Sequence, residues 1–147
     1  SKWAGLAGLR VGYGLMHEEV ANYLMDIKPP YNVNIAGEAA LVASLEDSEY
    51  LLSNVRKIVL ERDRMYRLLD DIHGVIPWPS EGNYILCQFN ENRAGKVYEA
   101  LASRGIFVRN FGSSRLTNCF RIAVGKPDET DVFITALENI LTRSNYA

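Results

Sequence analysis

The 147-residue sequence predicts an α/β protein in which long helices lead into a small α+β domain. Helical periodicity runs from about residue 35 to residue 72. From residue 75 onward, short apolar runs and helical patterns follow one another in the order β-α-β-β-α, which is typical of helices packed on one sheet. We therefore expect three segments along the chain, at 1–34, 35–72 and 73–147.

The first segment predicts mostly short elements. Residues 3–14 are rich in glycine and apolar side chains, and LRVGYG (9–14) predicts a short strand. Residues 17–27 predict a short helix, which ends at Lys28 because a residue before proline avoids helical backbone angles. The sequence PYNVN (30–34) then predicts an extended loop.

The remainder predicts two helical pieces followed by the α+β layer. The helical region breaks near residues 46–48, and its charged residues are expected to face solvent. Glycine commonly ends a helix and proline commonly opens one. After residue 74 we expect a strand over 83–89, a helix over 93–104 with Gly105 as its C-cap, strands over 106–109 and 119–124, and a final helix that Pro127 opens and that reaches about residue 143.

The composition is that of an ordinary globular protein. Hydrophobic residues make up 48% and charged residues 23% of the sequence, and the formal net charge is −2. This balance provides no electrostatic footprint for nucleic acid or for an anionic membrane. No uncharged run approaches the roughly 18 residues that span a bilayer, and no secretory signal is visible. We expect a cytoplasmic protein that binds neither nucleic acid nor membranes.

The cysteines and histidines do not predict a metal site. Cys87 and Cys119 each lie inside an apolar run, without the spacing of a zinc site or of a disulfide framework. We expect both to be small buried hydrophobic side chains in a reducing compartment. The two histidines, His17 and His73, are far apart in the sequence, so we expect no bound metal.

The first fourteen residues, SKWAGLAGLRVGYG, are the most informative stretch. A single lysine beside glycines is usually structural, but the whole string resembles the SK-x-x-G-LAGLR-x-GY pattern around the Schiff-base lysine of the class I and II aminotransferases, in their histidinol-phosphate branch. The resemblance continues, in the family's order, at PYNVN (30–34), SEGNYILCQF (80–89), GIFVRNF (105–111) and CFRIAVGKPDETD (119–131). Agreement at five separated segments makes chance similarity a poor explanation.

This resemblance implies a fold and an activity. It implies the C-terminal part of a fold-type I transferase that depends on pyridoxal 5′-phosphate (PLP), with the end of the large cofactor-binding domain at 1–34, connecting helices at 35–72 and the small domain at 73–147. The implied reaction converts histidinol phosphate and 2-oxoglutarate into imidazole acetol phosphate and glutamate, in histidine biosynthesis. The family expectation is a homodimer with active sites at the interface.

The resemblance also assigns cofactor-binding residues. Lys2 matches the lysine that holds PLP as an imine and then moves the substrate proton. Arg10 matches the arginine that grips the cofactor phosphate, a role that suits a guanidinium because it forms paired, charge-assisted hydrogen bonds. Ser1 matches a serine that contacts the same phosphate.

Further residues match substrate-binding positions of the family. Arg121 matches the arginine that clamps the substrate α-carboxylate, and Arg109, on a neighbouring strand, matches an arginine that helps to bind the substrate phosphate. We expect three residues of the loop at 30–34 to line or border the site near a dimer interface: Tyr31, Asn32 and Asn34.

Several alternatives stay open at this point. Threonine-phosphate decarboxylase uses the same scaffold and lysine, although the unbroken GLAGLRVGYG and VGKPDETD favour the aminotransferase; an aromatic amino-acid aminotransferase is a third enzyme. Outside enzymes, the chain could be an inert small-domain fragment or the effector-sensing end of a regulator, although no basic patch for DNA is present. Because the sequence starts without Met directly at the motif, we expect a piece of a longer protein that lacks transaminase activity alone.

Overall fold

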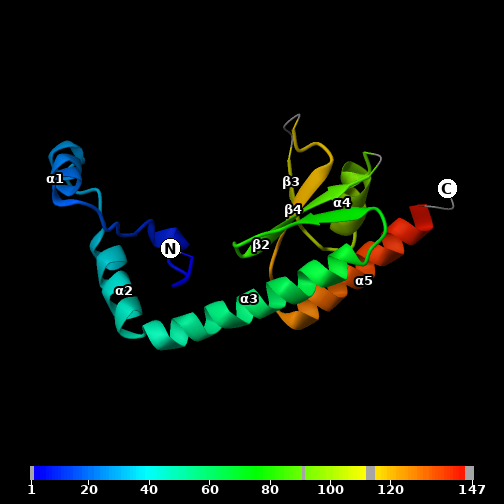
Figure 1. The fold of residues 1–147 in the computed structure, drawn as a ribbon, viewed down its shortest axis with the longest axis horizontal. Coiled ribbons are helices and arrows are strands. Elements are labelled where there is room, and N and C mark those ends of the chain that lie inside the picture. Colours follow the sequence, from blue (N-terminus) through cyan, green and yellow to red (C-terminus); the bar gives the residue numbers. More distant parts are fainter. Residues whose placement is uncertain (1, 91, 112–114, 145–147) are drawn as a thin grey trace. The chain divides into compact units, whose positions relative to one another are not determined.

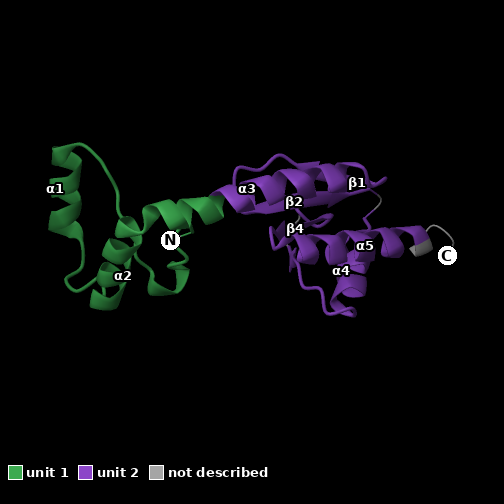
Figure 2. Cartoon of the chain, turned by 90° about the horizontal axis from the view of Figure 1, so that it is seen from below, with its two compact units in different colours: residues 1–55 green, residues 56–147 purple. Residues whose placement is uncertain are grey.

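The computed structural model describes residues 2–90, 92–111 and 115–144 (Figure 1). Its contacts divide the chain into two compact units, residues 1–55 and 56–147 (Figure 2), which are described separately below. The boundary between the units falls inside a helix, and the three segments expected from the sequence stay a prediction. The elements in chain order are a 3-10 helix η1 (Ala7–Leu9), α1 (Glu18–Ile27), α2 (Ile35–Glu46), α3 (Ser48–Asp70), β1 (Val75–Trp78), β2 (Tyr84–Phe89), α4 (Ala94–Ala102), β3 (Arg109–Asn110), β4 (Cys119–Ala123) and α5 (Pro127–Ser144).

Unit 1 is helical, and the strand expected at 9–14 is wrong. The structure has η1 followed by irregular backbone there, and every strand of the described residues lies between 75 and 123. The segment finds no strand to pair with, so its apolar and glycine residues do not form a ladder. The helix expected at 17–27 is confirmed as α1, and Lys28 ends it with an extended backbone (ψ 141°) before proline.

The long helical region is confirmed in two pieces. α2 and α3 are separated at Asp47, where the break was expected. The buried face of α3 lies in its second half, at Glu61, Met65 and Leu69. No helix of the described residues is both long enough and apolar enough to span a membrane.

Unit 2 is built on a four-stranded antiparallel sheet in the order β1-β2-β4-β3. β1 was not predicted, because Pro77 interrupts the apolar run VIPW; proline is tolerated here since β1 is an edge strand. β2 and β4 lie where expected, whereas β3 is shorter and later than the predicted 106–109.

Helices α3, α4 and α5 share one hydrophobic core with one face of this sheet. Alternate residues of β2, Ile85, Cys87 and Phe89, point into the core and meet Phe120 of β4, whose ring centroid lies 4.8 Å from that of Phe89. The expected helix-on-sheet layer is therefore confirmed. The opposite face of the sheet carries the remaining residues of each strand, including Arg121.

Two local expectations for this unit are also confirmed. Gly105 ends α4 with φ +76°, and the amide of Ile106 bonds back to the Leu101 carbonyl at 3.0 Å. Cys87 and Cys119 are free and buried, as expected. Burial raises the pKa of the Cys87 thiol to about 12, so it is protonated at neutral pH.

Candidate active site

The residues expected to form the site fall in both units. Lys2, Arg10 and the loop at 30–34 belong to unit 1, whereas Arg109 and Arg121 belong to unit 2. Ser1 lies outside the described residues.

Lys2 starts a short, glycine-dependent turn. The amide of Gly5 donates to the Lys2 carbonyl at 3.3 Å, and Gly5 has φ +68°, a left-handed conformation that favours glycine. The Lys2 side chain is exposed. The sequence therefore folds locally so that the amine of Lys2 is presented rather than buried within this unit.

Arg10 follows η1 in a left-handed conformation, with φ +54° and ψ 35°. Its Nη1 donates to the carbonyl of Ala7 at 3.2 Å, and its side chain is exposed. This bond uses one of the five N–H donors of the guanidinium. The side chain thus combines a local anchor with donors suited to an anion.

Unusual backbone conformations coincide with predicted site residues. Among the described residues, the non-glycine positions with positive φ are Arg10, Tyr31 and Asn92. Tyr31 has φ +61° and is 99% exposed. Such conformations are disfavoured for bulky residues and concentrate at functional sites, which supports a site at Arg10 and Tyr31.

Asn34 uses both ends of its amide within the protein. Its Nδ2 donates to the carbonyl of Leu9 at 2.9 Å, and its Oδ1 accepts from the amide of Gly37 at 2.6 Å, which caps the start of α2. Asn34 therefore links α2 to the residue before Arg10. That Tyr31, Asn32 and Asn34 line the site stays a prediction.

In unit 2 the two expected arginines lie directly opposite each other. Arg109 of β3 and Arg121 of β4 are register partners in an antiparallel pair, and both are exposed. Side chains in such a position are about 4.5–5.5 Å apart at Cβ, and like charges so placed repel. The adjacency expected from the sequence is confirmed, and the pair is suited to an anionic group that would relieve the repulsion.

Tyr84 is a neighbour of this pair that the sequence did not single out. The Cζ of Arg121 lies 4.7 Å from the centroid of the Tyr84 ring, within cation–π range. Tyr84 lies on β2, across from Ala123, so it is diagonal to Arg121 on the same sheet face. Only the strand register reveals this contact, and the sequence does not specify register across 37 residues.

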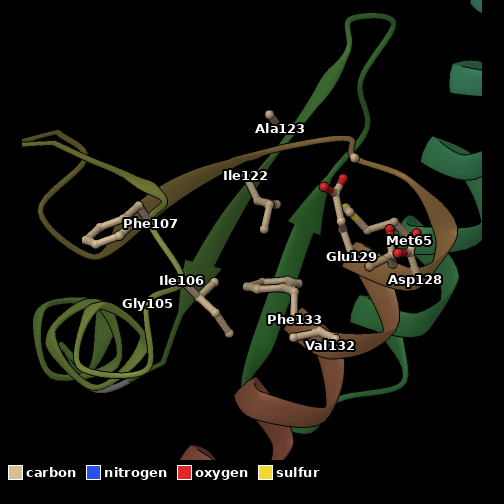
Figure 3. A pocket seen from close by; sticks show the side chains of 12 residues that line it. Met65, Gly105, Ile106, Phe107, Ile122, Ala123, Asp128, Glu129, Val132 and Phe133 are labelled. Atoms are coloured by element: carbon tan, nitrogen blue, oxygen red, sulfur yellow. The ribbon is translucent and has the colours of Figure 1, made fainter.

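A pocket of about 460 Å³ lies elsewhere in unit 2 (Figure 3). Apolar side chains such as Ile122 and Phe133 form much of its wall, with the carboxylates of Asp128 and Glu129 on one side and Phe107 on another. None of the predicted site residues lines it. Its acidic side chains do not suit a phosphorylated substrate, so the arginine pair is the better candidate site in this unit.

The chain is similar to known aminotransferases. A family model described as aminotransferase class I and II matches residues 1–137. A histidinol-phosphate aminotransferase of Dehalococcoides mccartyi is 50% identical over 137 residues, which cover 93% of this chain and 38% of that protein. One from Roseiflexus castenholzii is 46% identical over 143 residues, which cover 95% of this chain and 38% of that protein.

A solved structure resembles this fold over nearly the whole chain. The crystal structure of histidinol-phosphate aminotransferase from Sinorhizobium meliloti, in complex with pyridoxal 5′-phosphate, superposes with a TM-score of 0.81 at 32% identity. The match covers 97% of this chain and 40% of that chain. The present chain thus spans 38% of the length of each of the two relatives above. The activity in their names is that of proteins longer than this chain.

Proposed function

Because this chain belongs to the class I and II aminotransferase family, we propose that the complete protein is a PLP-dependent histidinol-phosphate aminotransferase. It would transfer the amino group of histidinol phosphate to 2-oxoglutarate, giving imidazole acetol phosphate and glutamate. The observation that carries this proposal is the opposed pair Arg109 and Arg121, two exposed cations on one sheet face. Both relatives named above, and the solved structure, carry the same enzyme name.

The described residues fit the cofactor at two positions of one segment. Lys2 presents an exposed amine, which suits an aldehyde, and Arg10 presents an exposed guanidinium on a left-handed backbone position, which suits a phosphate. When bound, the cofactor supplies the electron withdrawal that acidifies the substrate carbon bearing the amino group. The Nζ of Lys2 takes the proton from that carbon and releases it again as the amino group is transferred.

The arginine pair provides the substrate-binding charge. The two substrates use the site in turn, one with a phosphate ester and the other with carboxylates, and a guanidinium binds either group in a bidentate manner. Arg121 binds the carboxylate of the oxo acid, and Arg109 adds the second charge that a phosphate requires. Further parts of the proposal are a homodimeric assembly, a cytoplasmic location, and the inactivity of the 147-residue chain alone.

The proposal is tested on the complete protein with three amino compounds. Histidinol phosphate, phenylalanine and threonine phosphate are each incubated with 2-oxoglutarate and PLP, and glutamate and carbon dioxide are measured. We expect glutamate to form fastest with histidinol phosphate and no carbon dioxide to be released. Faster turnover of phenylalanine indicates an aromatic aminotransferase, and carbon dioxide released from threonine phosphate indicates a decarboxylase; either result contradicts the proposal.

A further inference from the structure

We infer that Asn34 is a positioning residue for Arg10, and that its amide holds the phosphate-binding guanidinium in place without touching the cofactor. The inference rests on the proposed role of Arg10 as a phosphate ligand, and it extends that role to a residue 24 positions further along the chain. Four neighbouring residues of unit 1 carry it: Leu9, Val11, Asn34 and Gly37.

The first contact fixes the peptide group that precedes Arg10. Asn34 Nδ2 donates to the Leu9 carbonyl oxygen at 2.9 Å. This oxygen belongs to the peptide group that joins Leu9 to Arg10. The bond therefore restrains the peptide plane relative to which the φ angle of Arg10 is defined. A tertiary hydrogen bond therefore acts directly on the backbone that aims the guanidinium.

The second contact gives Asn34 a rigid base. Its Oδ1 accepts from the amide of Gly37 at 2.6 Å, in the first turn of α2. A Cβ added to Gly37 would lie 3.1 Å from Nδ2 and 3.2 Å from Oδ1 of Asn34, and 3.2 Å from the Cβ of Val11. The absence of a side chain at Gly37 thus leaves room for the amide and for Val11 together.

Both sides of Arg10 are anchored as a result. Leu9 is held through its carbonyl, and Val11 is 6% exposed, whereas Arg10 itself is exposed. Arg10 has φ +54°, a conformation that a non-glycine residue leaves readily unless its surroundings maintain it. Preorganising a ligand-binding group in this way improves affinity, because less conformational freedom is lost on binding.

The test separates the two functions of the Asn34 amide. In Asn34→Ser the hydroxyl still caps α2, since serine is as good an N-cap as asparagine, but the shorter side chain cannot reach the Leu9 carbonyl. Asn34→Asp also retains the cap and cannot donate to that carbonyl, which gives a second variant if the first folds poorly. Asn139→Ser, the same substitution at an exposed position of α5, is the matched control.

We measure the dissociation constant and release rate of PLP in the complete protein by absorbance, together with thermal unfolding of the cofactor-free form. Asn34→Ser should weaken PLP binding about 5-fold, because the Arg10 backbone must then be ordered on binding, and the lost hydrogen bond should lower the unfolding temperature of the cofactor-free protein only slightly. In an Arg10→Ala background the same substitution should cause no further loss, because its effect passes through Arg10.

The outcomes distinguish this inference from the proposed function. If Arg10→Ala leaves PLP affinity unchanged, the assigned role of Arg10 is wrong. If Arg10→Ala weakens binding but Asn34→Ser and Asn34→Asp do not, only the inference about Asn34 is wrong. It is also wrong if the Asn34 and Arg10 effects add in full, since Asn34 would then act independently of the guanidinium.

Discussion

Arg121 has two neighbours with opposite electrostatic effects. The Tyr84 ring, 4.7 Å from Arg121 Cζ, attracts the guanidinium, whereas Arg109 on the adjoining strand repels it. The ring contact occupies one face of the planar guanidinium and leaves its N–H edges available for a carboxylate. Tyr84 therefore restricts the orientation of Arg121, while Arg109 raises the local positive charge.

Replacing Tyr84 should affect substrate binding more than folding. In the complete protein, Tyr84→Leu removes the ring and should raise the KM for 2-oxoglutarate about 2- to 5-fold, the value expected for an exposed cation–π contact. Tyr84→Phe keeps the ring and should retain most of the affinity. Steady-state kinetics check both, with Trp78→Leu as control, because Trp78 lies on the same sheet face two strands from Arg121. Equal effects of the Leu variants at 84 and 78 would contradict the orienting role.

At the scale of single residues, the sequence predicted which charged side chains belong to the candidate site, but not which neighbours contact them. Four charged residues were predicted as site residues because their types and neighbours match a known pattern: Lys2, Arg10, Arg109 and Arg121. The part that Tyr84 plays depends on strand register between β2 and β4, which the sequence leaves open. The hydrogen bond from Asn34 to the Leu9 carbonyl likewise joins positions 25 residues apart, and no local pattern indicates such a contact.

At the scale of elements, one ionic cluster joins α3 to the start of α5. Arg64 of α3 donates to both carboxylate oxygens of buried Glu61, at 3.0 and 2.8 Å, and also to Asp131 at 2.7 Å and to the Pro127 carbonyl at 2.9 Å. The Arg64 guanidinium holds the pKa of Glu61 below its usual value. The start of α5, which follows the strand that carries Arg121, is thereby fixed to α3.

This cluster predicts a specific pH dependence of stability. Because the pKa of Glu61 is lowered on folding, its stabilising effect is complete above the unfolded value of about 4.5 and is lost as pH falls through the folded value. Glu61→Gln should therefore lower the free energy of unfolding at pH 7 and should reduce its decline below pH 4.5. Urea denaturation from pH 3 to pH 7 measures both. Asp63→Asn, which removes a half-exposed carboxylate paired with Arg62, is the control and should change little. An unchanged Glu61→Gln profile would show that the cluster does not stabilise the fold.

The sequence predicted helices better than strands, for physical reasons. Helices are defined by local periodicity and by their ends, such as Lys28 at the end of α1 and Pro127 at the start of α5, so their bounds were nearly correct. A strand requires a partner: residues 9–14 have strand-like composition but no partner, and β1 has a partner despite Pro77. Gly105 was predicted correctly because a helix C-terminus requires its left-handed conformation locally.

At the scale of the whole molecule, the two units differ in how much they bury. Among residues 2–55 only Val11 and Gly37 are buried, and α1 has no buried residue. Large apolar side chains there are exposed, for example Leu15 at 92% and Ile35 at 84%. Nearly all of the hydrophobic core belongs to residues 56–147. The second unit therefore has the means to fold stably alone, and the first does not.

Hydrogen exchange should show this difference directly. In the 147-residue chain, amides of α1 and α2 should exchange close to the unfolded rate, whereas those of β2, β4 and α5 should be strongly protected. In the complete protein the amides of α1 and α2 should become protected, because further surface covers their apolar side chains. Mass spectrometry of deuterated peptides gives both values. Strong protection of α1 in the isolated chain would contradict the account of unit 1.

The family was predictable from the sequence because its motifs are spread over five separated segments, whereas the complete active site was not. The chain spans 38% of the length of the two relatives named above, and the roles of Lys2, Arg109 and Arg121 stay predictions from the sequence. Residue patterns predict which groups take part, whereas the contacts that orient each group within its own unit are not encoded locally in the sequence.

The identity of the cofactor lysine tests the central claim most directly. The complete protein is loaded with PLP and reduced with sodium borohydride, which fixes the cofactor to its lysine, and the labelled peptide is identified by mass spectrometry. The account predicts a label on Lys2, and none in a Lys2→Ala variant. A label on any other lysine, including Lys28, Lys57, Lys96 or Lys126, would contradict it.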